Sequence, residues 1–127
     1  MSAISKGSSV RDKVKYATSQ NVLGYPPEWV LEDIARATHS FVDFQKVMTT
    51  IWSRINDNGK NYPHIDKGLL VLEYVLQHGS SQVIHEARQH AFEIRTLAEF
   101  RYINKGAEVG QPIRARALAI SEFLASH

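Results

Sequence analysis

Apolar side chains recur at intervals of three and four residues along most of the chain, and this spacing constrains the fold more than any other feature of the sequence. The longest stripe consists of Phe41, Phe44, Val47, Met48, Ile51, Trp52 and Ile55. Such a stripe covers one face of an α-helix that packs on a core. Alternation with a period of two residues, which is typical of half-buried strands, does not persist over the length of a strand. The sequence therefore predicts an all-α fold.

Capping residues and turn formers divide this pattern into six expected helices. Ser9 and Ser40 each precede an acidic residue by three positions, as N-cap residues do at helix starts. A cluster of turn formers at residues 56–61 separates two apolar stripes. Gly79 follows the expected fourth helix, at the position where a glycine in the left-handed conformation often ends a helix. The helices are expected over residues 10–19, 27–38, 41–55, 62–78, 82–98 and 112–127, stacked in a right-handed superhelix.

The composition is that of one folded domain of 127 residues, with 43% hydrophobic and 22% charged residues. The chain has no cysteine, and no apolar run approaches the roughly 20 residues that span a bilayer. Since no signal segment precedes the first expected helix, these features predict a cytoplasmic protein. The net charge of +2 is too small to favour nucleic-acid binding.

The sequence lacks the motifs that would indicate catalysis or metal binding. It has no cysteine nucleophile, no Gly-rich phosphate loop and no His-Glu-x-x-His pair. His85 and His90 are five residues apart, which places them on different helix faces. We therefore expect no catalytic residues, no metal ligands and no cofactor. Four aromatic residues that fit the apolar stripes are expected in the core: Trp29, Phe41, Phe44 and Trp52.

Basic residues gather around the expected start of the fourth helix, which Arg54, Lys60, His64 and Lys67 bracket. A helix N-terminus presents unpaired N–H groups and a partial positive charge, and Lys60 in the preceding loop can close over a phosphate. His64 and Lys67 are three residues apart and share a helix face. This pattern predicts an anion site. The alternative is an ordinary solvated surface, with nearby acids such as Asp57 neutralising part of the charge.

The same segment resembles a known family. Residues 51–64, Ile-Trp-Ser-Arg-Ile-Asn-Asp-Asn-Gly-Lys-Asn-Tyr-Pro-His, are similar to the W-x-R-L-N-D-x-G-K-N-W-R-H signature of the epsin N-terminal homology (ENTH) domain. Residues 13–19 resemble the K-V-R-x-A-T-S of that family, and residues 72–76 and 78–80 continue the match downstream. The resemblance extends over residues 10–125 and implies an ENTH/VHS-like superhelix of six to seven α-helices.

The resemblance also implies a binding site for phosphoinositide headgroups. ENTH domains hold inositol phosphates with a first-helix arginine and with the Arg, Lys and His of the signature. The expected ligand is a headgroup such as that of phosphatidylinositol 4,5-bisphosphate or phosphatidylinositol 4-phosphate. The corresponding positions, together with two further basic residues that extend the set, are Arg11, Lys15, Arg54, Lys60, His64 and Lys67.

Three positions depart from the family pattern. Lys15 replaces an arginine and keeps its charge but loses the planar, bidentate fork. Gln20 stands where the family often has a headgroup-binding asparagine, and Pro63 replaces an arginine inside the signature. We therefore expect an affinity or a headgroup preference that differs from that of other members.

Residues 1–9 are expected to form a short flexible leader before the domain at residues 10–127. In epsins a longer leader folds into an amphipathic helix that inserts into lipid and lines part of the headgroup pocket. Here the leader has two large apolar side chains, Met1 and Ile4, and a glycine. That is too little apolar surface for a strongly amphipathic helix. We expect membrane docking with weak or no helix insertion.

Taken with the resemblance, these features imply a membrane-docking adaptor domain in clathrin-linked vesicle traffic and endocytosis. It would be a monomer, peripheral on the plasma membrane, on endosomes or the Golgi, or on clathrin-coated vesicles. The alternative is a protein-interaction module of the ENTH/VHS type that binds a SNARE, a coat protein or a sorting signal.

Overall fold

The computed structural model describes residues 4–127, which form seven α-helices, two short 3₁₀ helices and one two-stranded hairpin. The prediction of an all-α class is confirmed. In chain order the elements are α1 (Val10–Ala17), α2 (Glu28–Ala37), α3 (Phe41–Ile55), η1 (Gly59–Asn61), α4 (Tyr62–His78), α5 (Gln82–Gln89), α6 (Ala91–Thr96), η2 (Leu97–Glu99), β1 (Ile103–Asn104), β2 (Ala107–Glu108) and α7 (Gln111–Ser126). No described helix is long and apolar enough to cross a membrane.

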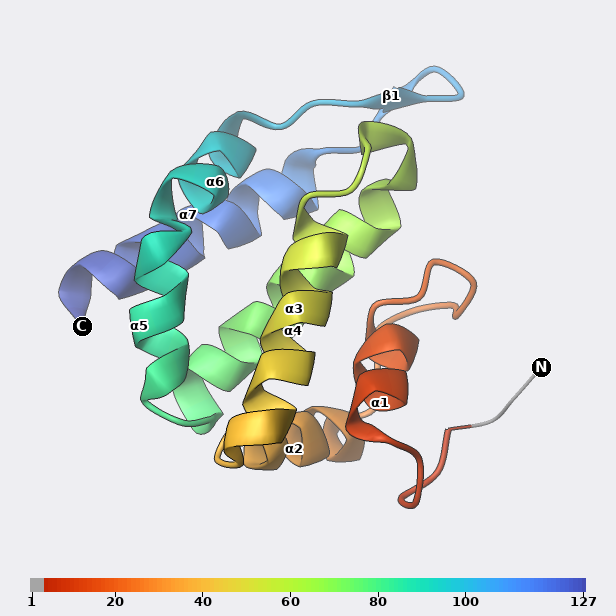
Figure 1. The fold of residues 1–127 in the computed structure, drawn as a ribbon. Coiled ribbons are helices and arrows are strands. Elements are labelled where there is room, and N and C mark those ends of the chain that lie inside the picture. The colour runs from red at the N-terminus through yellow and green to blue at the C-terminus, as the bar shows by residue number, and fades with distance from the viewer. Residues whose placement is uncertain (1–3) are drawn as a thin grey trace.

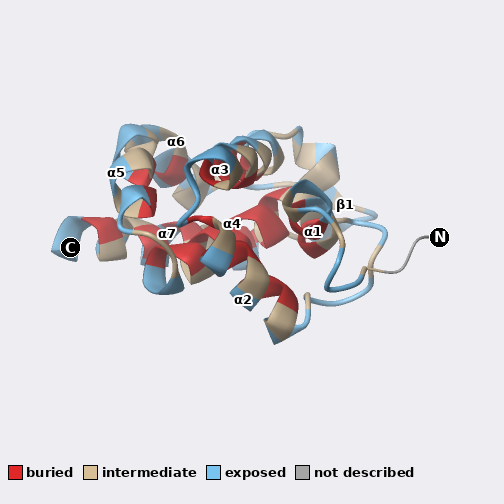
Figure 2. Ribbon diagram, turned by 60° about the horizontal axis from the view of Figure 1, so that its bottom comes forward, coloured by how far each residue is buried: buried red, intermediate tan, exposed pale blue. Residues whose placement is uncertain are grey.

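Helix α4 lies in the middle of the helical stack, where it packs against α2, α3 and α7 (Figure 1). Helix α1 lies against α3 and α2 at one side of the molecule, and α5 and α6 lie at the other. The buried faces of the helices point toward one another and the exposed faces point outward (Figure 2). The largest fully buried side chains include Ile34, Met48, Ile51, Ile55, Ile65, Leu69, Leu72, Ile94, Ile113 and Ile120. One hydrophobic core therefore holds all the helices together.

The predicted N-caps of α1 and α3 are confirmed. Ser9 Oγ accepts a hydrogen bond from the Asp12 amide at 3.1 Å, and Ser40 Oγ accepts one from the Asp43 amide at 3.5 Å. Phe44 and Trp52 are buried as expected, but the expectation for Phe41 is wrong, because its side chain is 80% exposed. Phe41 opens α3 at the edge of the core.

The expected fifth helix is two helices. The chain bends at His90, whose φ of −107° and ψ of 15° interrupt the helical geometry between α5 and α6. The His90 ring stacks on Trp52 with centroids 3.9 Å apart, and its Nδ1 lies 3.0 Å from the Glu93 carboxylate. These tertiary contacts favour the bend over a continuous helix. The segment between the expected helices 82–98 and 112–127 contains the β1–β2 hairpin, which turns at Lys105 and Gly106, both with positive φ.

An ion-pair network fastens the start of the chain to α2. Asp33 on α2 accepts hydrogen bonds from Lys6, from the buried Lys13 of α1 and from Arg36. Burial alone would raise the pKa of Asp33, but these hydrogen bonds outweigh it and hold the pKa at about 2. Lys6 also lies over the Trp29 ring, 5.2 Å from its centroid. Residues 1–3 of the expected leader lie outside the described residues, and the expected domain boundary at residue 9 stays a prediction.

Gly79 ends α4, but the left-handed conformation expected there is wrong, since its φ is −96° and its ψ is −163°. The need for glycine is steric. A Cβ at this position would lie 2.7 Å from Thr38 Oγ1 and 2.7 Å from the Val75 carbonyl oxygen. The Thr38 hydroxyl also accepts a hydrogen bond from the Ser80 amide at 2.8 Å. Glycine therefore allows the end of α4 to approach the end of α2.

We predict that Gly79→Ala lowers the free energy of unfolding by about 1–3 kcal/mol, because the added methyl group must displace backbone atoms. Urea unfolding followed by circular dichroism measures this change. Gly7→Ala is the matched control, since a Cβ at Gly7 meets nothing within 4 Å. Equal stability of the Gly79→Ala variant and the wild type would show that this contact is not tight.

Candidate functional site

Arg54, in the last turn of α3, is fixed to the end of α1. Its Nε donates a hydrogen bond to Thr18 Oγ1 at 3.0 Å. Thr18 is fully buried just past the end of α1, and its hydroxyl donates to the Val14 carbonyl at 2.8 Å. The guanidinium group is therefore held in one place before any ligand arrives, and the C-terminal end of α1 lies beside it.

His64 is positioned by its neighbours on two sides. Its Nδ1 lies 2.8 Å from Asp57 Oδ2, and Arg54 Nη1 lies 3.3 Å from its Nε2. A carboxylate can only accept, so the ring donates to Asp57 from Nδ1, while Arg54 Nη1, which also lies 3.5 Å from Nδ1, contacts both ring nitrogens. A loop (Asp57), a helix end (Arg54) and the first turn of α4 (His64) thus meet at one point.

Asp57 organises the turn between α3 and α4. Its carboxylate accepts hydrogen bonds from His64, from Asn61 Nδ2 at 3.2 Å and from the Asn58 amide at 2.7 Å. The bond from His64 lowers the pKa of Asp57 most, the bond from the Asn61 side chain adds to it, and burial opposes both. The resulting pKa is about 2, against an ordinary value of 3.8. The alternative of a solvated surface assigned Asp57 only the neutralisation of charge, whereas these bonds also shape the loop that carries Lys60.

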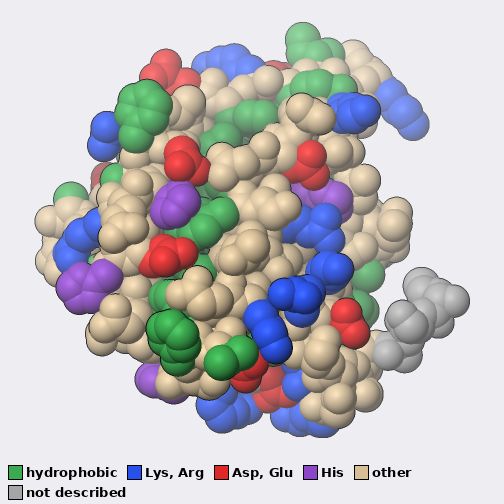
Figure 3. Space-filling view, in the orientation of Figure 1, with side chains coloured by type: hydrophobic (Ala, Val, Ile, Leu, Met, Phe, Trp, Pro, Cys, Tyr) green, Lys and Arg blue, Asp and Glu red, His purple; other side chains and the backbone are tan. Residues whose placement is uncertain are grey.

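Three of the expected basic residues are exposed around this fixed centre. Lys15 lies in the last turn of α1, Arg11 lies one turn before it, and Lys60 lies on η1. Figure 3 shows Lys and Arg side chains in a diagonal row over the side where α1 and α3 lie next to each other, with a histidine near one end. These long side chains can swing toward an anion that approaches Arg54.

Lys67 points inward instead. It is 7% exposed, and its ammonium group donates to the Ser19 carbonyl at 2.8 Å and to the Val22 carbonyl at 2.6 Å. Burial lowers its pKa. The next loop residue in the candidate site, Gln20, lies near η1, with its Nε2 3.5 Å from Asn61 Oδ1. Lys67 therefore supports the loop beside the site, whereas Arg54, His64, Lys15 and Lys60 can face a ligand.

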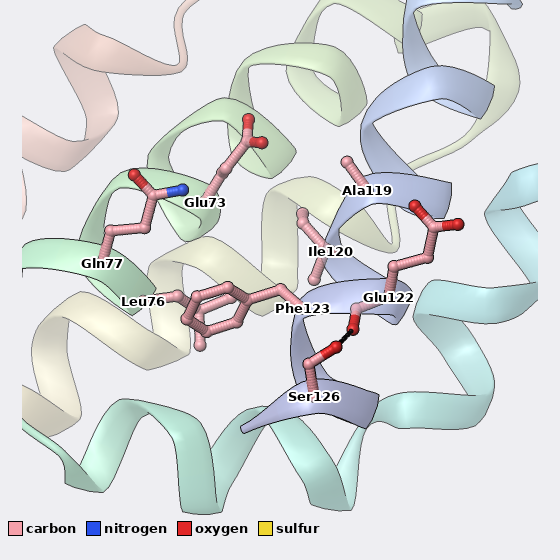
Figure 4. Close-up of a pocket in the computed structure, with 8 residues that line it drawn as sticks. All are labelled: Glu73, Leu76, Gln77, Ala119, Ile120, Glu122, Phe123 and Ser126. Carbon is pink, nitrogen blue, oxygen red and sulfur yellow. Dashed lines mark hydrogen bonds between the residues drawn. The ribbon is translucent and has the colours of Figure 1, made fainter.

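The arrangement suits an anion, because it presents hydrogen-bond donors and positive charge. Within residues 4–127, no three His, Asp or Glu side chains converge as metal ligands would. A hollow of about 290 Å³ between α4 and α7 lies elsewhere, and Glu73 and Glu122 stand at its two sides (Figure 4). Those carboxylates would repel a phosphate. The candidate site is therefore the group of basic residues between the ends of α1 and α3 and the start of α4. We call it the basic cluster, and it consists of Arg11, Lys15, Arg54, Lys60 and His64.

We predict that Asp57 makes the stability of the fold sensitive to acid. A carboxylate whose pKa is depressed on folding stabilises the fold above its unfolded pKa of 3.8, and this contribution is lost as the pH falls toward about 2. Asp57→Asn should lower the free energy of unfolding by up to about 2 kcal/mol at neutral pH. The gap in unfolding free energy between the variant and the wild type should narrow below about pH 4.

Thermal unfolding of both proteins across this pH range measures the gap. Glu122→Gln, at an exposed carboxylate on α7, is the matched control for the loss of a surface charge. A gap between wild type and Asp57→Asn that stays constant down to about pH 2 would contradict the prediction.

Comparisons with known proteins show the family of the chain. The family model for the ENTH domain matches residues 7–127. Epsin from Dictyostelium discoideum is 40% identical over 115 residues, which cover 91% of this chain and 17% of that protein. Clathrin interactor EPSIN 2 from Arabidopsis thaliana is 40% identical over 112 residues, which cover 87% of this chain and 12% of that protein. The chain thus spans less than a fifth of the length of these curated relatives.

Solved structures show the same fold. The ENTH domain from epsin-2, solved in complex with phosphatidylinositol 4,5-bisphosphate, superposes with a TM-score of 0.90 at 35% identity and covers 98% of this chain and 88% of that one. The human epsinR ENTH domain gives a TM-score of 0.86 at 32% identity, covering 93% and 88%. The superhelical architecture predicted from the sequence is confirmed, and the chain belongs to the ENTH domain family.

Proposed function

We propose that this domain docks on membranes by binding a phosphoinositide headgroup in the basic cluster. The observation that carries the proposal is the fixed Arg54, held by Thr18 and beside His64, with exposed Lys15 and Lys60 around it. A planar guanidinium suits a phosphate because it donates two parallel hydrogen bonds, and a pre-positioned one loses little freedom on binding. The ligand would be the headgroup of phosphatidylinositol 4,5-bisphosphate or 4-phosphate.

Two solved relatives support this proposal. The epsin-2 ENTH domain was solved with phosphatidylinositol 4,5-bisphosphate. Helical ANTH and ENTH tubules were solved on membranes that contain this lipid, and their matching chain gives a TM-score of 0.78 at 31% identity with this one, covering 94% of this chain and 78% of that one. The shared fold and the matching signature residues support the same ligand class for the basic cluster.

The residues have different parts in this proposal. Arg54 and His64 form the fixed centre, while Lys15, Lys60 and Arg11 supply mobile charge. Each basic side chain near an anionic leaflet contributes about 1 kcal/mol of attraction. Lys67 acts indirectly, by holding the neighbouring loop through its two carbonyl partners. The cell-level role that follows is that of a peripheral, non-catalytic adaptor in clathrin-linked traffic at the plasma membrane, endosomes or Golgi.

The test is co-sedimentation with vesicles that contain phosphatidylinositol 4,5-bisphosphate, phosphatidylinositol 4-phosphate or phosphatidylserine at matched surface charge. We predict that Lys60→Glu weakens binding to phosphoinositide vesicles by about 2 kcal/mol, or about thirtyfold, because it replaces an attraction with a repulsion. Lys60 is exposed on a surface turn, so its substitution should leave the fold intact.

Arg95→Glu is the matched control, since it also changes an exposed basic residue to an acid, on α6 at the other side of the molecule. The loss of affinity caused by Arg95→Glu should be several-fold smaller than the loss caused by Lys60→Glu. Equal losses in both variants, or equal binding of the wild type to phosphoinositide and phosphatidylserine vesicles, would overturn the headgroup site.

A second candidate function is protein docking. A hollow of about 390 Å³ between the α2–α3 corner and α5 is lined by the exposed Phe41, the buried Phe44 and His85. It lies at the opposite end of α3 from Arg54, roughly 20 Å away along the 15-residue helix. A SNARE, a coat protein or a sorting signal could therefore occupy it while the basic cluster faces a membrane.

A further inference from the structure

The α1–α2 loop, residues 18–27, presents one fully exposed aliphatic side chain. Leu23 is 100% exposed, which leaves the whole of a large apolar side chain in water. Single exposed leucines are common on protein surfaces, so exposure alone carries no function. What distinguishes Leu23 is the structure of the loop that carries it.

The loop is braced on both sides of Leu23. On one side, the buried Lys67 donates to the carbonyls of Ser19 and Val22. On the other side, the Tyr25 hydroxyl donates to Asp66 at 3.0 Å, and the Arg116 guanidinium lies 5.1 Å from the Tyr25 ring centroid.

Arg116 in turn donates to Asp66 at 2.9 Å, which ties this side of the loop to both α4 and α7. Between the two braces, Gly24 has a φ of +74° and turns the chain. A leucine on a free loop could fold back onto the core. The hydrogen bonds on both sides of Leu23 keep its side chain exposed and away from the core.

The loop also lies beside the basic cluster. Gln20 reaches Asn61 of η1, next to Lys60, and Thr18 at the start of the loop binds Arg54. Figure 1 shows the loop projecting from the body of the molecule next to α1. Residues 18–27 contain no charged side chain, so no charge in the loop would be repelled by an anionic surface or would have to leave water when Leu23 enters its apolar part.

We infer that Leu23 inserts into the lipid surface when the basic cluster holds a headgroup, and so acts as an apolar anchor on a rigid loop. This inference rests on the proposed function, and it adds an anchor outside the N-terminal leader. Electrostatic attraction brings the loop to the leaflet, and burial of the leucine side chain in the boundary of the acyl chains adds apolar binding energy.

The test uses the absence of cysteine from the chain. A single cysteine placed by Leu23→Cys carries an environment-sensitive nitrobenzoxadiazole label, and Phe92→Cys is the matched control. Phe92 is also an exposed apolar residue, and its helix α6 lies on the far side of the molecule from the loop. Both labelled proteins are mixed with phosphatidylcholine vesicles that contain phosphatidylinositol 4,5-bisphosphate, and the same samples are sedimented.

The expected result is that both proteins sediment, and that only the label at position 23 shifts to the blue and is quenched by lipids with nitroxide-bearing acyl chains. If the protein sediments while the label at position 23 stays in water, the inference is overturned and the proposed function stands. A lipid signal from both labels also overturns it, because the dye itself would be entering the bilayer. If neither protein sediments, the proposed function fails and the inference fails with it.

A label-free variant separates the anchor from the headgroup site. Leu23→Ser should lower the affinity for the same vesicles about tenfold, as expected for losing the burial of one leucine. Its affinity for soluble inositol trisphosphate, measured by calorimetry, should equal that of the wild type, because Leu23 contacts lipid and not the headgroup. Unchanged vesicle affinity, or an equal loss for the soluble headgroup, would contradict the inference.

Discussion

The close approach of α4 to the last turn of α3 determines where the charged groups of the site lie. Gly68 on α4 permits it, since a Cβ there would lie 3.1 Å from Ile55 Cγ1 and 3.2 Å from Arg54 Cβ. Because the helices are so close, the first turn of α4 places His64 beside Arg54, and the next turn sends Lys67 beneath the α1–α2 loop. The end of α1, the end of α3 and the loop thus share one rigid support.

Two lysines of this small domain serve as internal fasteners. Lys13 donates to Asp33 and to the Lys6 carbonyl, and Lys67 donates to two loop carbonyls. A buried ammonium group is costly unless hydrogen bonds replace its lost water, and the lowered pKa of Lys67 shows that burial still disfavours its charge. Each amine joins separate segments of the chain: Lys13 joins α1 to α2 and to the backbone at Lys6, and Lys67 joins α4 to the α1–α2 loop.

The sequence predicts the helical class, most helix boundaries and the signature residues because these depend on local spacing and capping. It did not predict the bend at His90, where stacking on Trp52 overrides helical periodicity. The sequence also does not show that Lys67 is buried and Lys60 exposed, because the residue type is the same whether the ammonium group points to solvent or to a carbonyl. Thr18, which fixes Arg54, gave no signal of its own, because the contact joins residues 36 positions apart.

The site therefore combines two kinds of positive charge with different physical consequences. Arg54 is already ordered by Thr18 and by its contact with His64, so it can contribute geometric selectivity at a small entropic cost. Lys15 and Lys60 are exposed, and they contribute attraction at longer range but lose rotamer freedom when they close on a phosphate. Under the proposed function, headgroup choice should depend on the fixed centre, and the strength of membrane attachment should depend on the exposed lysines and on the neutral loop beside them.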